Sequence, residues 1–271
     1  MPMIVKRENP QITQLREQVN RNPEHAADAV LAAAEAGDVD AQVLLGQMLL
    51  EGRGIARDPA LALRWFQSAA KLKHPMALNL IGRCLEHGLG CRQNVEDAAA
   101  YYRVSAEMGL DWGLYHYANL MITGQGKVPR DAAHAVVLYQ RAAETGHAMS
   151  MHMLGCCYED GVGVPVDIDQ AQQWYRRAAE SGDFRAQYRH AATLIAQDDI
   201  EGAAPWLDSV RANGNLKFLR SIRTELLTSP DARLRAYAEA FHERAAELGD
   251  SSDRDAWIIA RVGTASASTT Q

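Results

Sequence analysis

One phrase recurs four times along this chain of 271 residues, at a spacing of 36 or 37 residues. Each copy contains a small residue, two glycines, an Asp or Asn, an Ala, a pair of large side chains and a pair of small ones, in that order. The copies begin at Gly46, Gly82, Ala118 and Gly155. Self-similarity at this period is typical of solenoids, in which each unit buries its apolar face only against its neighbours. The period therefore restricts the chain to a repeat fold.

Each copy contains the start and stop signals of two helices. In the first copy, apolar residues from Ala41 to Leu49 recur at intervals of three and four, which predicts a helix that ends near Glu51. The two glycines that follow are able to take the positive φ that a helix C-terminus needs. Asp58-Pro59 predicts the start of the second helix, because Asp accepts backbone N–H bonds as an N-cap and Pro fits the first helical position. The same capping slot is filled in the other copies by Asn94, Asp131 and Asp167.

The small residue in the first helix of each copy predicts a crowded contact. A glycine inside a helix costs about 1 kcal/mol relative to Ala, so its recurrence as Gly46, Gly82 and Gly155 indicates a steric requirement. We expect the second helix to approach closely at this point through its own small residue, so that large neighbours interlock around the contact. These small residues are Ala62, Ala98, Ala135 and Ala171.

The whole phrase closely resembles the Sel-1-like repeat, a relative of the tetratricopeptide repeat. Residues 150–182 match it nearly in full, and the resemblance covers about residues 37 to 182. The third copy departs most, with one extra residue between Gly126 and Asp131 and with Ala118 where Gly is expected. The resemblance implies an all-α fold, a right-handed α/α superhelix (solenoid) of Sel-1-like helical hairpins.

The sequence outside the four copies predicts caps and one degenerate repeat. The start signals Asn9-Pro10 and Asn22-Pro23 predict two helices before the first repeat. We expect N-terminal capping helices in 1–37, four Sel-1-like repeats in 38–182, a degenerate fifth repeat in 183–214, C-terminal capping helices in 215–262 and a mobile tail in 263–271.

The fifth repeat lacks the two-glycine loop, a loss of about four residues, and Pro205 is expected near the start of its second helix. Two amphipathic helices follow. One contains Leu219, Ile222 and Leu226, and the other begins at Ser229-Pro230 and carries apolar residues through Leu248. A short closing helix is expected at 255–261.

Composition narrows the possible partners and compartments. The net charge of −6 and the pI near 5.8 argue against a nucleic-acid partner. No uncharged stretch approaches the roughly 20 residues that cross a bilayer, so no membrane role is expected. Residues 1–10 lack the pattern of a secretory leader, and four unevenly spaced cysteines do not form a disulfide framework. We therefore expect a cytoplasmic protein.

The sequence contains one stripe that could support chemistry. The paired glycines complete neither a dinucleotide-binding fingerprint nor a phosphate-binding loop, and nucleophile-elbow and zinc-protease motifs are absent from the sequence. We therefore expect no catalytic residue, no metal and no cofactor. The alternative is a metal- or thiol-dependent hydrolase centred on His152 and Cys156, which with Asp160 lie at i, i+4 and i+8 on one helical face.

The resemblance to tetratricopeptide repeats implies a binding groove. In those relatives the first helix of each hairpin lines the concave face, and residues at fixed offsets from the central small residue face the ligand. The alternative is an ordinary solvated helix face. By register, the expected groove residues are Asn79, Arg83, Trp112, Tyr115, Asn119, His152, Cys156, Arg185 and Tyr188.

The preferred interpretation is a non-enzymatic scaffold or adaptor that binds a protein or peptide partner, with the resemblance implying a bacterial signalling or regulatory complex. We expect a monomer. A third possibility is a homo-oligomer joined through the C-terminal helices.

Overall fold

The computed structural model describes residues 10–229 and 231–249. These residues form fourteen α-helices and one short 3₁₀ turn, with no β-strand among them. The all-α solenoid predicted from the repeat is thereby confirmed. Asn9 and Pro230, which belong to two of the expected helix starts, lie outside the described residues. So do the expected helix at 255–261 and the expected mobile tail.

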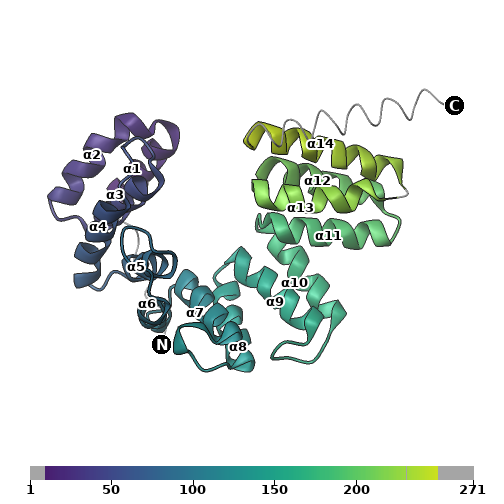
Figure 1. Ribbon diagram of the computed structural model, residues 1–271, viewed down its shortest axis with the longest axis horizontal. Helices are drawn as coiled ribbons and strands as arrows, with labels where there is room; N and C mark the ends of the chain where they lie inside the picture. Colours follow the sequence, from purple (N-terminus) through teal and green to yellow (C-terminus); the bar gives the residue numbers. More distant parts are fainter. Residues whose placement is uncertain (1–9, 230, 250–271) are drawn as a thin grey trace. The chain divides into compact units, whose positions relative to one another are not determined.

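The chain divides into two compact units, residues 1–145 and 146–271. In both, helices that follow one another in sequence pack together as hairpins (Figure 1). The helices of the first unit are α1 (Pro10–Arg21), α2 (Pro23–Glu35), α3 (Val39–Glu51), α4 (Pro59–Lys71), α5 (Pro75–His87), α6 (Val95–Glu107), α7 (Asp111–Thr123) and α8 (Ala132–Glu144). Those of the second are α9 (Ala148–Asp160), α10 (Ile168–Glu180), α11 (Phe184–Ala196), α12 (Ile200–Asn213), α13 (Leu216–Leu227) and α14 (Ala232–Leu248). We call α3, α5, α7, α9 and α11 the A helices, and α2, α4, α6, α8, α10 and α12 the B helices.

The A helices end where the first loop glycine predicts. Helix α3 stops at Glu51, and Gly52 takes a left-handed conformation with φ +74°. Its N–H donates to the Met48 carbonyl over 2.8 Å, which satisfies one of the carbonyls that a helix end leaves open. Gly88, Gly124 and Gly161 end the next three A helices in the same way.

The B helices begin at the predicted caps. The carboxylate of Asp58 accepts a hydrogen bond from the Leu61 N–H over 2.9 Å. Asn94, Asp131 and Asp167 each accept from the backbone N–H three residues further on. Asn22 caps α2 in the same way, although it is the single residue between α1 and α2.

The central glycines do face a B helix, but the residue that they touch is not the predicted alanine. A Cβ at Gly82 would lie 2.6 Å from Cε1 of Tyr102. Gly46 meets Phe66 and Gly155 meets Tyr175 in the same manner. The expectation of a crowded contact is confirmed, whereas its assignment to the small residue of the B helix is wrong. At these three positions a Cβ would lie closer to the aromatic ring than ordinary contacts allow, so the ring occupies the space that a side chain would take.

The second loop glycine joins one repeat to the preceding one. A side chain at Gly54 would collide with the backbone of Pro23, the first residue of α2. Gly90 lies equally close to Pro59 of α4. At Gly126 a Cβ would lie 2.6 Å from the carbonyl oxygen of the corresponding α6 residue. In the first unit, each two-glycine loop therefore packs on the start of the preceding B helix.

The fifth repeat has the predicted shorter loop, because only residues 197–199 join α11 to α12, where 52–58 join α3 to α4. Pro205 lies inside α12, beyond its first turn, rather than near the helix start. The reason is Asp199, whose carboxylate caps the helix by accepting from the Gly202 N–H over 2.8 Å.

The last two helices bury the predicted stripes. Leu219, Ile222 and Leu226 of α13 are buried, and α14 packs on both α13 and α12. Phe241 of α14 is fully buried, whereas Leu248 at its end is 45% exposed. None of the helices in the described part of the chain combines the length and apolar character that a membrane crossing requires.

Candidate protein-interaction site

The predicted groove residues all lie on A helices, and they form one set in each unit. The first-unit set comprises Asn79 and Arg83 on α5 and Trp112, Tyr115 and Asn119 on α7. The second-unit set comprises His152 and Cys156 on α9 and Arg185 and Tyr188 on α11.

Within the first-unit set, two of the five residues belong to the packed interior. Asn79 is 1% exposed and Tyr115 is 7% exposed. The Tyr115 ring meets Trp112 edge to face, with 6.2 Å between the ring centroids. Arg83, Trp112 and Asn119 are half-buried and remain able to touch a partner.

Asn119 is held in place from the B helix of its own hairpin. The Tyr139 hydroxyl donates a hydrogen bond to its Oδ1 over 2.5 Å. In the preceding hairpin the Tyr102 hydroxyl instead donates to Glu86 over 2.7 Å. These bonds fix polar side chains of the A helices against buried rings of the B helices.

The second-unit set adjoins a polar network that the sequence reasoning missed. The Tyr175 hydroxyl donates to Oε2 of Glu159 over 2.7 Å. The other oxygen of Glu159 accepts from the Arg189 guanidinium over 3.4 Å. Arg189 also lies over the Tyr175 ring, 5.8 Å from its centroid. One ring of α10 is thus connected to charged groups on α9 and α11.

A signal for this network exists in the sequence. Glu86 and Glu159 each follow the central glycine by four residues, and in both hairpins the ring facing that glycine is a Tyr. The first copy has Leu50 at the carboxylate position and Phe66 at the ring position. Hydroxyl and carboxylate are therefore present together or absent together in these three copies.

His152 and Cys156 lie close together in an environment that keeps both neutral. The Cys156 Sγ is 3.9 Å from Nε2 of His152 and accepts a hydrogen bond from the Tyr175 hydroxyl over 3.5 Å. Burial raises the pKa of the Cys156 thiol and lowers the pKa of the His152 imidazole. A thiolate nucleophile needs the opposite shifts. In residues 10–229 and 231–249 no group of three His, Cys, Asp or Glu residues is placed to hold a metal ion.

The α11 members of the second-unit set are anchored by neighbours. Arg185 forms an ion pair with the buried Asp183 over 3.7 Å and lies over the Phe184 ring. Tyr188 is 8% exposed and meets Phe218 of α13 edge to face. Burial raises the pKa of the Tyr188 hydroxyl. Tyr188 therefore contributes mainly to packing, and Arg185 keeps a half-buried cation near the surface.

A pocket of about 320 Å³ lies beside this network, between α9, α10 and α11. Its apolar side is formed by Ile168, Ala192 and Ala196, and its polar side includes Glu159 and Arg189. Ala192 lies seven residues after Arg185 and four after Tyr188, and hence on the same face of α11. Ile168, the first residue of α10, is 51% exposed. In the first unit the two-glycine loops cover the starts of α2, α4 and α6, but the fifth repeat lacks that loop and leaves the start of α10 uncovered. An apolar pocket with charged groups at its margin suits an amphipathic side chain of a partner.

Stacked helical hairpins joined by two-glycine loops define the class as an α-solenoid repeat protein. The family model of the Sel1 repeat matches residues 39–74, 75–110, 113–147, 148–183 and 229–250. The chain therefore belongs to the Sel1 repeat family. Four matches coincide with the expected repeats, and the fifth falls on α14, in the part expected to form capping helices.

Solved structures agree with this assignment. The chain is similar to a Sel1 repeat protein from Oxalobacter formigenes, with 25% identity and a TM-score of 0.71 over 87% of this chain and 99% of that one. It shares its fold with a protective antigen of uropathogenic Escherichia coli, with 24% identity and a TM-score of 0.58 over 90% and 54% of the two chains.

A curated relative is chitin synthase regulatory factor 3 of Schizosaccharomyces pombe, 27% identical over 154 residues. The match covers 56% of this chain but only 16% of that protein. Sel1 repeat proteins are typically non-catalytic scaffolds that mediate protein–protein interaction.

Proposed function

We propose that this chain is a non-enzymatic adaptor that binds a protein or peptide partner on the face formed by its A helices, in a bacterial signalling or regulatory complex. The regulatory context is supported by the similarity to a chitin synthase regulatory factor. The observation that carries the proposal is the pocket between α9, α10 and α11, with Arg189 and Glu159 at its margin.

The second-unit face is the part of the predicted groove best suited to a partner. Arg189 is half-exposed although it is paired with Glu159, so both charged groups remain accessible. Ion pairs of this kind contribute little to stability, and a partner's carboxylate can replace Glu159 as the acceptor at small cost. The apolar side of the pocket supplies contact area for the partner's side chain.

The test is to fill the pocket without disturbing the core. Ala192→Arg places a long side chain at the half-buried Ala192. A matched control is Ala100→Arg, which adds the same side chain to an exposed position on α6. Cross-linking capture from native cells is compared for the three proteins after circular dichroism has established equal helicity. Partners lost with Ala192→Arg and retained with Ala100→Arg support the proposal, and identical partner sets for all three contradict it.

A further inference from the structure

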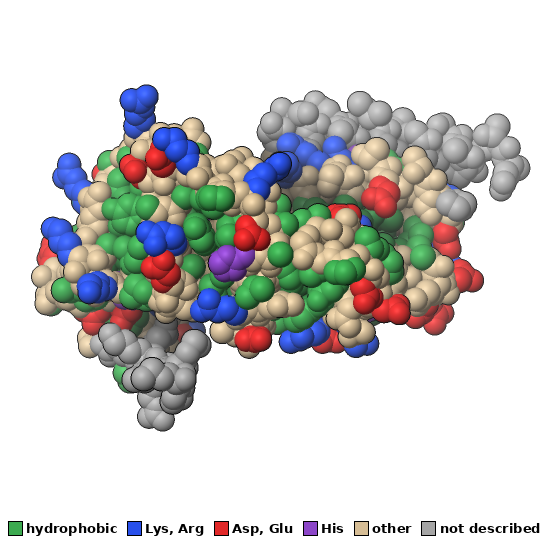
Figure 2. Space-filling view, turned by 90° about the horizontal axis from the view of Figure 1, so that it is seen from below, with side chains coloured by type: hydrophobic (Ala, Val, Ile, Leu, Met, Phe, Trp, Pro, Cys, Tyr) green, Lys and Arg blue, Asp and Glu red, His purple; other side chains and the backbone are tan. Residues whose placement is uncertain are grey.

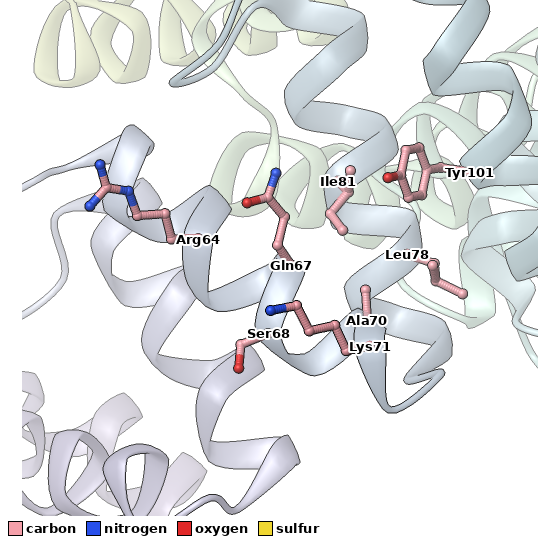
Figure 3. Close-up of a pocket in the computed structure, with 8 residues that line it drawn as sticks. All are labelled: Arg64, Gln67, Ser68, Ala70, Lys71, Leu78, Ile81 and Tyr101. Carbon is pink, nitrogen blue, oxygen red and sulfur yellow. The ribbon is translucent and has the colours of Figure 1, made fainter.

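A second pocket lies in the first unit, between the B helix α4 and the hairpin that follows it. Its volume is about 640 Å³. Arg64, Gln67, Ser68 and Lys71 of α4 line one side, and the other side is formed by Leu78, Ile81 and Tyr101 of the next hairpin (Figure 3). The two sides differ in chemistry, because the α4 side carries charged and polar hydrogen-bonding groups and the opposite side is mainly apolar.

The cationic character of this pocket is specific to one hairpin. In α2, α6, α8 and α10 the position of Lys71 is occupied by a carboxylate in every case: Glu35, Glu107, Glu144 and Glu180. The position of Arg64 is occupied by Asp28, Ala100, Val137 and Gln173. Helix α4 thus ends in a cation where these four B helices end in a carboxylate, and it carries a second cation seven residues earlier on the same face.

A third cation stands just beyond the helix, at a position that favours glycine. Lys73 has φ +56°, in the left-handed region. After α2, α6, α8 and α10 the corresponding residues are glycines with positive φ: Gly37, Gly109, Gly146 and Gly182. A residue held in an unfavourable backbone conformation often marks a functional site. Here it adds a positive charge next to Lys71.

These cations are not used in internal ion pairs. Arg64, Lys71 and Lys73 have no carboxylate within ion-pair distance among the residues that the structure describes, and Arg64 and Lys71 are exposed. On the face shown in Figure 2, charges of both signs are scattered among apolar side chains. Among the helices that the structure describes, α4 and α11 are the two that contain no Asp or Glu.

In the second unit a pocket also lies between a B helix and the A helix that follows it, but different residue types line it. A pocket of about 450 Å³ lies between α10 and α11. Its lining includes Gln173, Arg176 and His190 at the positions of Arg64, Gln67 and Ile81, together with the acidic Asp169. The second-unit pocket is lined by charges of both signs, whereas the charged residues that line the first-unit pocket, Arg64 and Lys71, are both cations, which favours an anion.

We propose that the surface formed by Arg64, Gln67, Lys71, Leu78 and Tyr101 docks an acidic peptide segment of a partner protein, with one apolar side chain inserted against α5 and α6. Seven residues of helix rise about 10 Å, close to the length of three extended residues. Two carboxylates two or three residues apart therefore reach both cations. Two cations, Arg64 and Lys71, are among the residues that line this pocket, and Lys73 follows Lys71 by two residues. So few cations suit a short peptide better than a nucleic acid, whose affinity requires many phosphate contacts. This site lies beside a B helix and is separate from the site proposed on the A helices.

The probe is a fluorescein-labelled synthetic peptide of ten residues, Asp and Glu with a central Leu-Phe pair, titrated by fluorescence anisotropy. Two comparison probes are the same peptide with Ser-Ser in place of Leu-Phe and an oligo-dT of equal charge. The variant is R64Q/K71E, which gives α4 the residues of α10 at these positions and so is expected to fold. The control variant R92E/R141E removes two exposed cations elsewhere.

We expect saturable binding of the acidic-apolar peptide, at least tenfold weaker binding to R64Q/K71E, unchanged binding to R92E/R141E, and weaker binding of both comparison probes. Absence of saturable binding to the wild-type chain, or equal affinity for R64Q/K71E, overturns the proposal. Preferential binding of oligo-dT also overturns it. None of these results depends on Ala192, so failure here and failure of the A-helix site are distinguishable.

Discussion

The contact between a central glycine and an aromatic ring predicts the effect of a single added methyl group. In Gly82→Ala the new Cβ would lie 2.6 Å from Cε1 and 2.8 Å from Cδ1 of Tyr102, where ordinary contacts begin at 3.4 Å. The Tyr102 ring is fully buried and its hydroxyl is fixed to Glu86 over 2.7 Å. The ring must move by about 0.8 Å, and movement strains or breaks that hydrogen bond.

The magnitude follows from two opposing effects. Ala stabilises a helix interior by about 1 kcal/mol relative to Gly. Overpacking costs about 1–3 kcal/mol, and loss of a hydrogen bond to a charged group costs roughly 1.5–3 kcal/mol. We therefore expect Gly82→Ala to lower the free energy of unfolding by about 2 kcal/mol. In urea denaturation followed by circular dichroism, this corresponds to a midpoint lower by roughly 1 M.

A double-mutant cycle separates the steric effect from helix propensity. In the Tyr102→Leu background the ring is absent, so Gly82→Ala is expected to be neutral or stabilising by up to about 1 kcal/mol. Equal destabilisation in both backgrounds would refute the reasoning. The same contact at Gly155 predicts that Gly155→Leu prevents the second unit from folding, and an unchanged melting temperature would contradict it.

Three further predictions concern backbone strain, pH and thiol reactivity. Lys73→Gly should raise stability by about 1 kcal/mol, measured by urea denaturation, because Lys73 has φ +56°; an unchanged or lower midpoint would argue against strain there. Burial lowers the pKa of His152 below 6.5, so the unfolded chain binds a proton that the folded chain does not. Stability should therefore be full above about pH 6.5 and fall as the pH drops below it, and His152→Gln should flatten this dependence of the melting temperature; an equal slope in both proteins would exclude His152 as the cause. Burial raises the pKa of Cys156 and raises that of Cys157 to about 11, so an alkylating reagent at about pH 8 should modify both only after unfolding; rapid modification of folded Cys156 in peptide mass spectrometry would favour thiolate chemistry.

The ends of the A helices and the starts of the B helices in the four repeats could be predicted from the sequence because helix caps act over a few residues. Asp58 accepts from an N–H three residues away, and Gly52 needs only its own freedom to take positive φ. The shorter loop of the fifth repeat was also predictable, since a missing segment shifts the register of the apolar residues. The repeat phrase, read in four registers, was enough to identify the family.

Contacts between helices depended on how the helices cross. The recurrence of Gly46 predicted a close approach, yet the partner proved to be Phe66 rather than Ala62. Register identifies equivalent positions in different repeats, but it does not predict which residue of the neighbouring helix a side chain contacts. For the same reason the predicted groove positions Asn79 and Tyr115 could not be recognised as buried.

The sequence by itself determined the period, the caps, the loop glycines and hence a solenoid of hairpins, because these depend on interactions within one turn or one loop. Only the tertiary structure brought Glu159, Tyr175 and Arg189 together from three helices, and only it placed cations of α4 and apolar residues of the next hairpin around one pocket. Such sites depend on the crossing of helices tens of residues apart, which is decided by the packing of whole side chains and not by any local pattern.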